Sequence, residues 1–192
     1  MKNTLLKGLL YLTCCMVIFG IMGCEEPIRQ SVGSETYYLR YNFHYTTEKG
    51  KMKGSIANYT NMSGHEILTF GSSVKVAPSS SGFALIDEIS GRKIDVLASS
   101  KYLAGKNLSD YLDLILSKTP VSYTDLSEID RKGISEGRPY KGMSKKGVMI
   151  ALGYPAPHRT ASPDADVWYY WRNRFANYTV NFENGIVTSS GY

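Results

Sequence analysis

Residues 37–46 of this 192-residue chain read YYLRYNFHYT and give the clearest strand signal in the sequence. Large aromatic or aliphatic side chains alternate with polar ones, and alternate residues of a strand point to opposite faces. One face would carry Tyr37, Leu39, Tyr41, Phe43 and Tyr45, and the other Arg40, Asn42, His44 and Thr46. The pattern predicts one strand with a buried face and a solvent-facing one.

Shorter runs of strand-forming residues follow this stretch. They cover residues 55–59, 66–70, 73–77, 83–89 and 93–97, with glycine-containing turns at Gly64, Gly71, Gly82 and Gly91. Short strands at close spacing are typical of small barrels and strongly twisted sheets. We therefore expect residues 36–100 to form a small antiparallel β-barrel-like domain.

Near Leu108 the hydrophobic period lengthens from two residues to the period of a helix. The first helix is expected from Leu108, with Ser109 as its cap and Lys118 at its end, in a linker of residues 101–123. Two more are expected at 125–132, capped by Thr124, and at 145–152, capped by Ser144. Strands at 167–173, 177–183 and 186–190 complete the chain, the last two joined by an Asn-Gly hairpin signal.

The C-terminal part also follows a known pattern. The matching residues are Gly142-Met-Ser-Lys145, Val148, Leu152, Gly153, Pro155, Trp168-Tyr-Tyr170, Val180-Asn-Phe182 and Asn184-Gly185. Over about residues 125–190 they resemble the SmpA/OmlA (BamE-like) family of outer-membrane lipoproteins. The resemblance implies a two-helix, three-strand (ααβββ) module in residues 124–192, whose relatives assist β-barrel assembly or bind other proteins. With the N-terminal barrel, which has no counterpart in the minimal family member, the expected fold class is α+β.

The first residues follow the pattern of an exported lipoprotein. Lys2 and Lys7 precede an apolar run at 9–21, which is shorter than the roughly 20 residues that span a bilayer. Residues 1–23 therefore read as a signal peptide. The run ends in Ile21-Met-Gly-Cys24, which resembles a bacterial lipobox. We expect cleavage before Cys24, lipidation of its thiol, and a polar tether over residues 24–35.

Cysteine usage agrees with a lipid anchor. The chain has three cysteines, Cys14, Cys15 and Cys24, so the mature protein would keep one and form no internal disulfide. No aspartate follows Cys24, which resembles the default route to the outer membrane, with the protein on its periplasmic side. The alternative is an ordinary signal peptide with an incidental cysteine.

Charge and motifs exclude several classes of function. The net charge of +5 is spread over scattered basic residues, so nucleic-acid binding is not expected. Residues 137–144 have P-loop spacing, but Met143 replaces the required lysine. Ser72-Ser-Val-Lys75 fits a serine-enzyme motif, but it lies in a predicted strand and not at a helix start.

Metal, cofactor and catalytic sites are likewise not expected. His44, His65 and His158 lack metal-ligand spacing and are expected to be surface histidines. Asp164 and Asp166 are expected to be solvated loop acids. The sequence therefore predicts a protein that is not an enzyme, with no cofactor and no bound metal.

An aromatic and basic cluster is the remaining candidate site. Its candidate partner-binding residues are Trp168, Tyr169, Trp171, Arg172, Arg174 and Phe175. Large aromatics beside arginines are typical of binding hot spots, but the same face can equally be covered by the N-terminal domain. Both interpretations stay open at this point.

The expected function is a lipid-anchored binding or scaffold lipoprotein of the outer membrane, assisting envelope or β-barrel protein assembly, with an envelope protein as partner. One alternative is a lipoprotein that binds a cell-wall or lipid ligand. Another is an enzyme inhibitor or a hydrolase, and a pocket with convergent polar groups around His44 or Ser72 would favour the enzyme.

Overall fold

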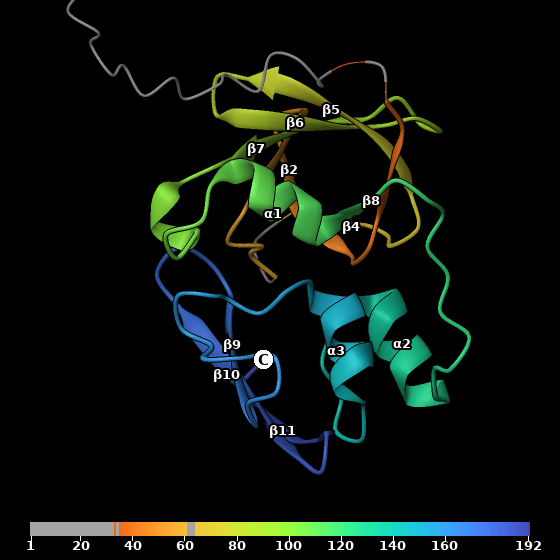
Figure 1. Cartoon of the computed structure of the whole chain (residues 1–192), viewed down its shortest axis with the longest axis vertical. Helices are drawn as coiled ribbons and strands as arrows, with labels where there is room; N and C mark the ends of the chain where they lie inside the picture. The colour runs from red at the N-terminus through yellow and green to blue at the C-terminus, as the bar shows by residue number, and fades with distance from the viewer. Residues whose placement is uncertain (1–32, 34, 61–63) are drawn as a thin grey trace, which may run out of the picture.

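The computed structural model describes residues 33, 35–60 and 64–192, which hold eleven strands and three α-helices (Figure 1). The predicted signal peptide, the lipobox with Cys24 and nearly all of the tether lie outside the described residues. The strands are β1 (Tyr37–Leu39), β2 (Phe43–Glu48), β3 (Lys51–Ser55), β4 (His65–Leu68), β5 (Ser73–Ser79), β6 (Gly82–Asp87), β7 (Lys93–Leu97), β8 (Leu116–Ser117), β9 (Val167–Trp171), β10 (Asn177–Glu183) and β11 (Ile186–Ser190). The helices are η2 (Ser100–Tyr102, a 3-10 turn), α1 (Leu108–Ile115), α2 (Glu128–Glu136) and α3 (Lys145–Leu152).

The expected α+β fold is wrong, because the described chain is mostly β. Eight of its strands form one curled, mixed sheet in the order β4-β2-β3-β7-β6-β5-β1-β8, and the other three form a sheet in the order β11-β10-β9. The predicted antiparallel barrel is also wrong, since β3 and β7 pair in parallel, with Met52 opposite Ile94. Periodicity reveals strands but not their partners, and β1 and β8 are too short to give a period of their own.

The curl of the large sheet follows from its strand order. β1 and β2 are consecutive in the chain, yet they lie near opposite ends of the sheet. The chain can connect them through residues 40–42 only if the sheet wraps around. The wrapped sheet encloses the N-terminal core, where Phe83, Leu85, Ile94 and Val96 are fully buried. Helix α1 packs on this core and lies under the sheet in Figure 1.

The stretch 37–46 forms two strands, where the sequence predicted one. The chain leaves the sheet at residues 40–42, where the N–H of Asn42 donates to the carbonyl of Ile150 at 2.8 Å. The Asn42 amide group also donates to the carbonyls of Ile134 and Ala151, at 2.7 and 3.2 Å. These bonds tie the break between β1 and β2 to α2 and α3, far along the chain.

The predicted solvent face of this stretch is buried as well. Asn42, His44 and Thr46 are 2%, 1% and 5% exposed. The last carbonyls of a helix have no partner within the helix, and the polar side chains of this face supply donors to them. His44 Nε2 lies 2.8 Å from the carbonyl of Ala151, and the Asn58 amide donates to the carbonyl of Leu152 at 2.5 Å. We call this contact of Asn42, His44 and Asn58 with the end of α3 the seam.

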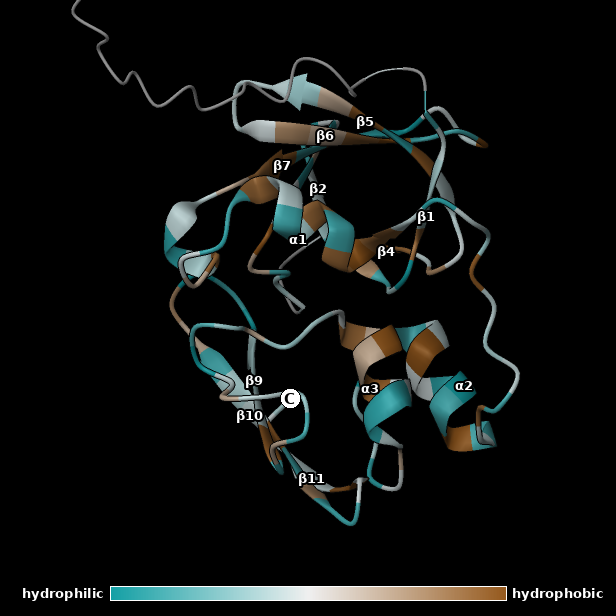
Figure 2. Cartoon of the chain, in the orientation of Figure 1, coloured by the Kyte–Doolittle hydropathy of each residue, from teal (hydrophilic) through white to brown (hydrophobic). Residues whose placement is uncertain are grey.

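The C-terminal core lies between α2, α3 and the small sheet. It contains Met143, Val148, Leu152, Trp168 and Val180, all at most 1% exposed. In Figure 2 each of the three α-helices carries both hydrophobic and hydrophilic colours, as amphipathic helices do. The domain boundaries at residues 36, 101 and 124 stay a prediction.

The agreement between predicted and observed element boundaries varies along the chain. The predicted bounds of α3, β10 and β11 are confirmed, and Ser144 does cap α3. The second helix begins three residues later than expected, because Ser127 caps it, not Thr124, and forms a capping box with Asp130. In the same way Asn107, not Ser109, caps α1. The strand expected at 55–59 lies at Lys51–Ser55.

Candidate binding site

A hollow lies between α1, η2 and the loop of residues 153–158 that follows α3. It consists of two cavities of about 30 and 100 Å³. Both are lined by Tyr102, Tyr111, Leu114, Tyr154 and Pro157. We call these two cavities the seam hollow, because the smaller one reaches Asn42 and Asn58. Its walls therefore come from segments far apart in the sequence.

Three tyrosine hydroxyls in this lining have no hydrogen-bond partner among the described residues. They belong to Tyr41, Tyr111 and Tyr154, and burial is the main cause that raises the pKa of each. All three side chains are half-buried, and their hydroxyls stay accessible to water or to a bound group. The three hydroxyls can therefore donate to, or accept from, an occupant of the hollow.

An aromatic rim continues from the hollow onto the surface. The ring of Trp171, at the end of β9, stacks on His158 with 5.9 Å between centroids and 17° between planes. Tyr102 contacts both rings, at 5.9 Å from Trp171 and 5.4 Å from His158. The hydroxyls of Tyr59 and Tyr102 are 3.0 Å apart. We call Tyr59, Tyr102, His158 and Trp171 the aromatic rim.

Positive charges surround the aromatic rim. The Arg159 guanidinium lies 5.9 Å from the Trp171 ring, and the Lys101 ammonium lies 4.6 Å from the Tyr102 ring. Lys106 lines the larger cavity beside one acid, Asp110, whose carboxylate accepts from the Asn107 N–H at 3.2 Å. Burial, then Arg159 and Lys101, lower the pKa of His158. The surroundings of the rim are therefore positively charged even while His158 is neutral.

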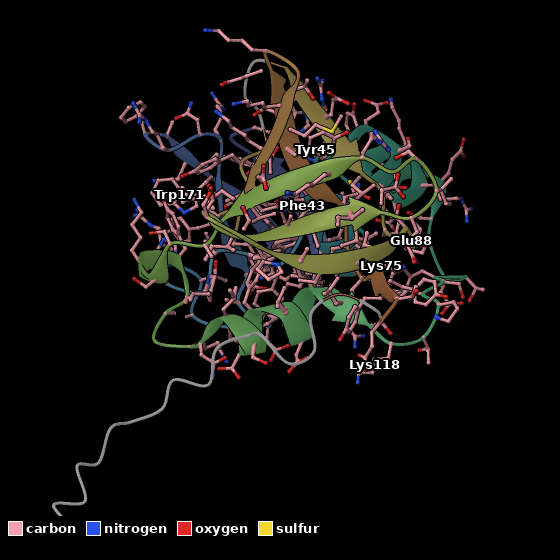
Figure 3. All side chains as sticks on the ribbon, turned by 90° about the horizontal axis from the view of Figure 1, so that it is seen from above. Phe43, Tyr45, Lys75, Glu88, Lys118 and Trp171 are labelled. Atoms are coloured by element: carbon pink, nitrogen blue, oxygen red, sulfur yellow. The ribbon has the colours of Figure 1, made fainter. Side chains whose placement is uncertain are left out.

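The structure separates the predicted partner-binding residues into two groups. Trp168 is 1% exposed, packs on Phe182 and donates to the Pro163 carbonyl, so it belongs to the C-terminal core. The other five residues lie wholly or partly at the surface: Tyr169, Trp171, Arg172, Arg174 and Phe175. Trp171 packs against the N-terminal core, and Figure 3 places it at the opposite side of the molecule from Lys75 and Glu88.

The aromatic cluster is therefore partly covered by the N-terminal domain and partly an exposed surface. Trp171 is half-buried and packs against the N-terminal core, whereas Phe175 is 79% exposed. Phe175 lies in the loop between β9 and β10, where Asn173 Oδ1 accepts from the N–H of Phe175 at 2.9 Å and that of Ala176 at 3.0 Å. The Arg174 guanidinium lies 4.3 Å from the Phe175 ring. The ordered loop holds an aromatic side chain in solvent.

His44 is not a surface histidine, contrary to expectation. A carbonyl only accepts, so His44 Nε2 must carry the proton that it donates to Ala151. His44 Nδ1 is then an acceptor, and His65 Nε2 donates to it at 2.6 Å. Burial, then His65, lower the pKa of His44 to about 3. His158 is exposed, as the sequence predicted.

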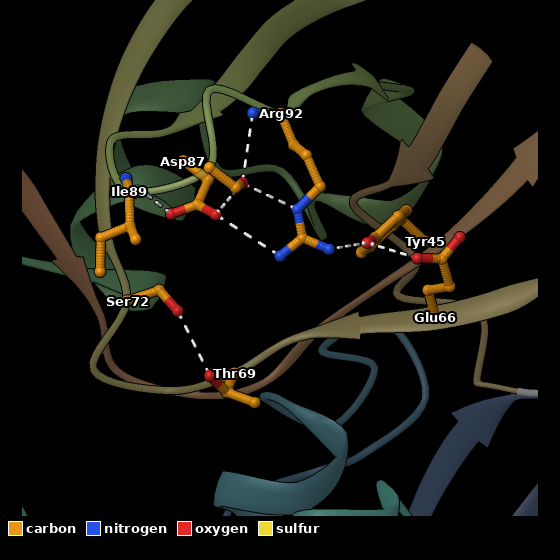
Figure 4. A network of polar contacts seen from close by, with 8 residues as sticks. Tyr45, Glu66, Thr69, Ser72, Asp87, Ile89 and Arg92 are labelled. Atoms are coloured by element: carbon orange, nitrogen blue, oxygen red, sulfur yellow. Dashed lines mark hydrogen bonds and ion pairs between the residues drawn. The ribbon is translucent and has the colours of Figure 1, made fainter. Parts of the chain in front are cut away.

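The residues of the rejected motifs have structural partners. Lys75 pairs with Glu88 at 3.4 Å, while the Ser72 and Thr69 hydroxyls lie 3.3 Å apart. Figure 4 shows the latter pair near a separate network in which Arg92 contacts Asp87 and Tyr45. The Lys145 ammonium lies 2.7 Å from the Asp164 carbonyl and 3.3 Å from the Asp166 carboxylate, so it engages the loop that carries the two acids. Neither cavity of the seam hollow includes His44 or Ser72.

Sequence reasoning missed most of the seam hollow. Tyr102, Tyr111 and Tyr154 come from three segments that no motif connects. The signal available was the high tyrosine content, 15 residues, which suits interfaces but does not locate them.

No protein family, curated protein or solved structure matches this chain. In residues 33, 35–60 and 64–192, no three His, Cys, Asp or Glu side chains are grouped as a metal site. In that same part of the chain, no helix is long and apolar enough to cross a membrane.

Proposed function

We propose that this protein is a lipid-anchored scaffold lipoprotein on the periplasmic side of the outer membrane, where it binds an envelope protein. The observation that carries the proposal is the aromatic rim, in which Trp171 is held half-buried beside exposed cationic side chains. Partly buried aromatics with arginine neighbours are the residues that dominate binding energy at protein interfaces.

The size of the seam hollow favours a protein partner over a small envelope ligand. Sites for small molecules usually measure about 300–1,000 Å³. The two cavities here measure about 30 and 100 Å³. Such a hollow accommodates one side chain of a partner, and the neighbouring surface supplies the rest of the interface. Binding of a cell-wall or lipid fragment is therefore the second candidate.

The proposed location rests on the sequence. The lipobox at residues 21–24 supports an anchor on Cys24, and the resemblance of residues 125–190 to the SmpA/OmlA (BamE-like) family supports the outer membrane and a role in envelope or β-barrel assembly. Several acyl chains on one cysteine give effectively stable membrane attachment.

Changing Arg174 to Glu and Phe175 to Ser together is expected to reduce partner capture about tenfold, because an exposed anchor and its positive neighbour are both lost. The measurement is photo-crosslinking in intact cells from a probe at Thr179, with the captured protein identified by mass spectrometry. Both side chains are at the surface, so the variant should fold.

Ile89→Ser is the matched control, since Ile89 is 87% exposed in the turn after β6 and borders neither cavity. It should leave capture unchanged. If the control and the double variant capture the partner equally well, the surface of Arg174 and Phe175, close to Trp171 in the chain, is not part of the binding surface. Recovery of glycan fragments without any protein would favour the second candidate.

Replacing Cys24 by Ser is expected to leave the fold intact but to release the protein from the outer membrane, or to trap the uncleaved precursor. The thioether that anchors the chain cannot form on a hydroxyl. Cell fractionation and the mass of the N-terminal peptide measure the outcome. A cleaved Cys24→Ser protein that still fractionates with the outer membrane would refute the anchor.

A further inference from the structure

We propose that the seam hollow is an anchor pocket for an acidic, extended segment of the partner protein. One apolar side chain of the segment enters the hollow, and its carboxylates lie on the surrounding cations. This inference rests on the proposed function and adds the chemistry of the partner.

The lining sets what can enter. Leu103, Leu114 and Pro157 give the larger cavity apolar walls, and the rings of Tyr102 and Tyr154 close it. A volume of about 100 Å³ is below the 150 Å³ or so of an engineered cavity that binds benzene. An aliphatic side chain of leucine size therefore fits better than a sugar ring or an acyl chain.

The charged side chains around the hollow determine which partner residues can lie beside the inserted side chain. Lys106 borders the cavity, Lys101 lies against Tyr102, and Arg159 lies against Trp171. None of the three forms a salt bridge with an acid of the described chain, whereas Lys145 and Lys75 do. The acid in the lining, Asp110, is engaged at the start of α1. Three cations without counter-ions beside an apolar cavity complement carboxylates that flank an apolar side chain.

The tyrosine hydroxyls explain why an extended segment suits the site. Tyr111 and Tyr154 line both cavities, and their hydroxyls have no partner among the described residues. An extended segment has unpaired backbone N–H and C=O groups on both sides of its inserted side chain. Tyrosine hydroxyls can donate to the C=O groups and accept from the N–H groups.

Three end-capped, fluorescein-labelled nonapeptides test the proposal by fluorescence anisotropy on the full Cys24→Ser chain. The first has a central leucine flanked by glutamates, the second replaces the leucine by serine, and the third replaces the glutamates by glutamines. We expect the first to bind most tightly, the other two to bind at least fivefold more weakly, and salt to weaken the first peptide most.

Two variants locate the binding. Lys106→Glu should weaken the first peptide about tenfold, because it reverses a charge at the cavity, while Lys141→Glu is the matched control on the turn between α2 and α3. Leu114→Trp should fill the hollow from α1 and abolish binding, with circular dichroism as the check on folding. Lys106 is exposed, so its variant is informative even if Leu114→Trp fails to fold.

Equal binding of all three peptides, or equal weakening by Lys106→Glu and Lys141→Glu, overturns the proposal. Preferential binding to phosphatidylglycerol vesicles over the first peptide also overturns it, in favour of a lipid surface. The two proposals can fail separately. If Lys106→Glu keeps full partner capture in cells but the double variant at Arg174 and Phe175 loses it, the anchor-pocket inference is wrong and the proposed function stands. If neither variant affects capture, both are wrong.

Discussion

Replacing Asp130 by Ala should lower the free energy of unfolding by about 3 kcal/mol, since it removes a buried carboxylate that caps two helices. Asp130 is 2% exposed in the first turn of α2. One of its oxygens accepts from the Ser144 N–H at 2.8 Å. The other accepts from the N–H and hydroxyl of Ser127, at 3.2 and 2.8 Å, and from the Ser144 hydroxyl at 3.1 Å.

The effect is large because α2 and α3 begin beside the same carboxylate. The positive ends of both helix dipoles favour a negative charge there. Removal of the carboxylate leaves the N–H groups of Ser127 and Ser144 without their acceptor, and loss of a helix cap costs about 0.5–2 kcal/mol per helix. Gly147 has room beside Asp130 only because it lacks a Cβ, which would lie 2.0 Å from a carboxylate oxygen.

Urea denaturation measures the change in the free energy of unfolding. Two further variants test whether the change is specific to the carboxylate of Asp130. Asp130→Asn should destabilise about as much as Asp130→Ala, because one side of an amide donates hydrogen and would face a donor. Asp125→Ala removes an exposed acid just before the helix and should change stability by less than about 0.5 kcal/mol. A loss below about 1 kcal/mol for Asp130→Ala would refute the shared cap.

The fold could be predicted from the sequence as far as local signals reach. Local signals located α3, β10 and β11, because Ser144 caps the helix and the Asn184-Gly185 turn, with Gly185 at φ 78°, separates the two strands. Pairing of β3 with β7 has no local signal, since it depends on how the sheet curls around Phe83 and Ile94. The antiparallel barrel was wrong for that reason, and the α+β class was wrong because the described chain is mostly β.

The alternation in residues 37–46 shows a second limit. Asn42 and His44 do lie on the face opposite Phe43 and Tyr45, as period two requires. A polar face usually means solvent, but here it supplies hydrogen bonds to the end of α3. Nothing in the stretch itself distinguishes the two cases, because the carbonyls it pairs with belong to residues about 100 positions later.

The candidate site was predictable only in part, for a similar reason. Trp171, Arg174 and Phe175 are neighbours in sequence, so their cluster is visible without a structure. The seam hollow beside them is formed by Tyr111 from α1 and Tyr154 from the loop after α3. Their proximity is a consequence of the seam, which itself rests on long-range hydrogen bonds.

Stability should fall steeply as the pH drops from 7 to 4, by roughly 3 kcal/mol from His44 alone. The pKa of His44 is about 3 in the folded protein against a usual value of 6.5, because burial disfavours the charged ring. The unfolded chain therefore takes up a proton near pH 6.5, while the folded protein does not until about pH 3. The stabilisation is complete above pH 6.5 and is lost as the pH falls toward 3.

Of the groups around the ring, His65 adds to the effect of burial on the pKa of His44 and the Ala151 carbonyl opposes it. His65 disfavours a charge on His44, and burial and then Arg138 lower the pKa of His65 itself. The backbone carbonyl of Ala151 opposes the shift, but its effect is smaller than that of burial. A proton on His44 Nδ1 would face the proton on His65 Nε2, which lies 2.6 Å away. Protonation of His44 therefore disrupts the seam, because the neutral His44 ring caps the end of α3.

Urea denaturation at pH 7, 6, 5 and 4 compares the unchanged protein with His44→Phe, which removes both the titrating ring and its hydrogen bonds. The variant should be less stable at pH 7 yet lose less stability between pH 7 and 4, because only carboxylates and the other two histidines still titrate. His158→Gln is the control and should keep most of the pH dependence of the free energy of unfolding, since His158 is exposed. If the unchanged protein and His44→Phe lose stability in parallel, His44 does not control the acid sensitivity of the seam.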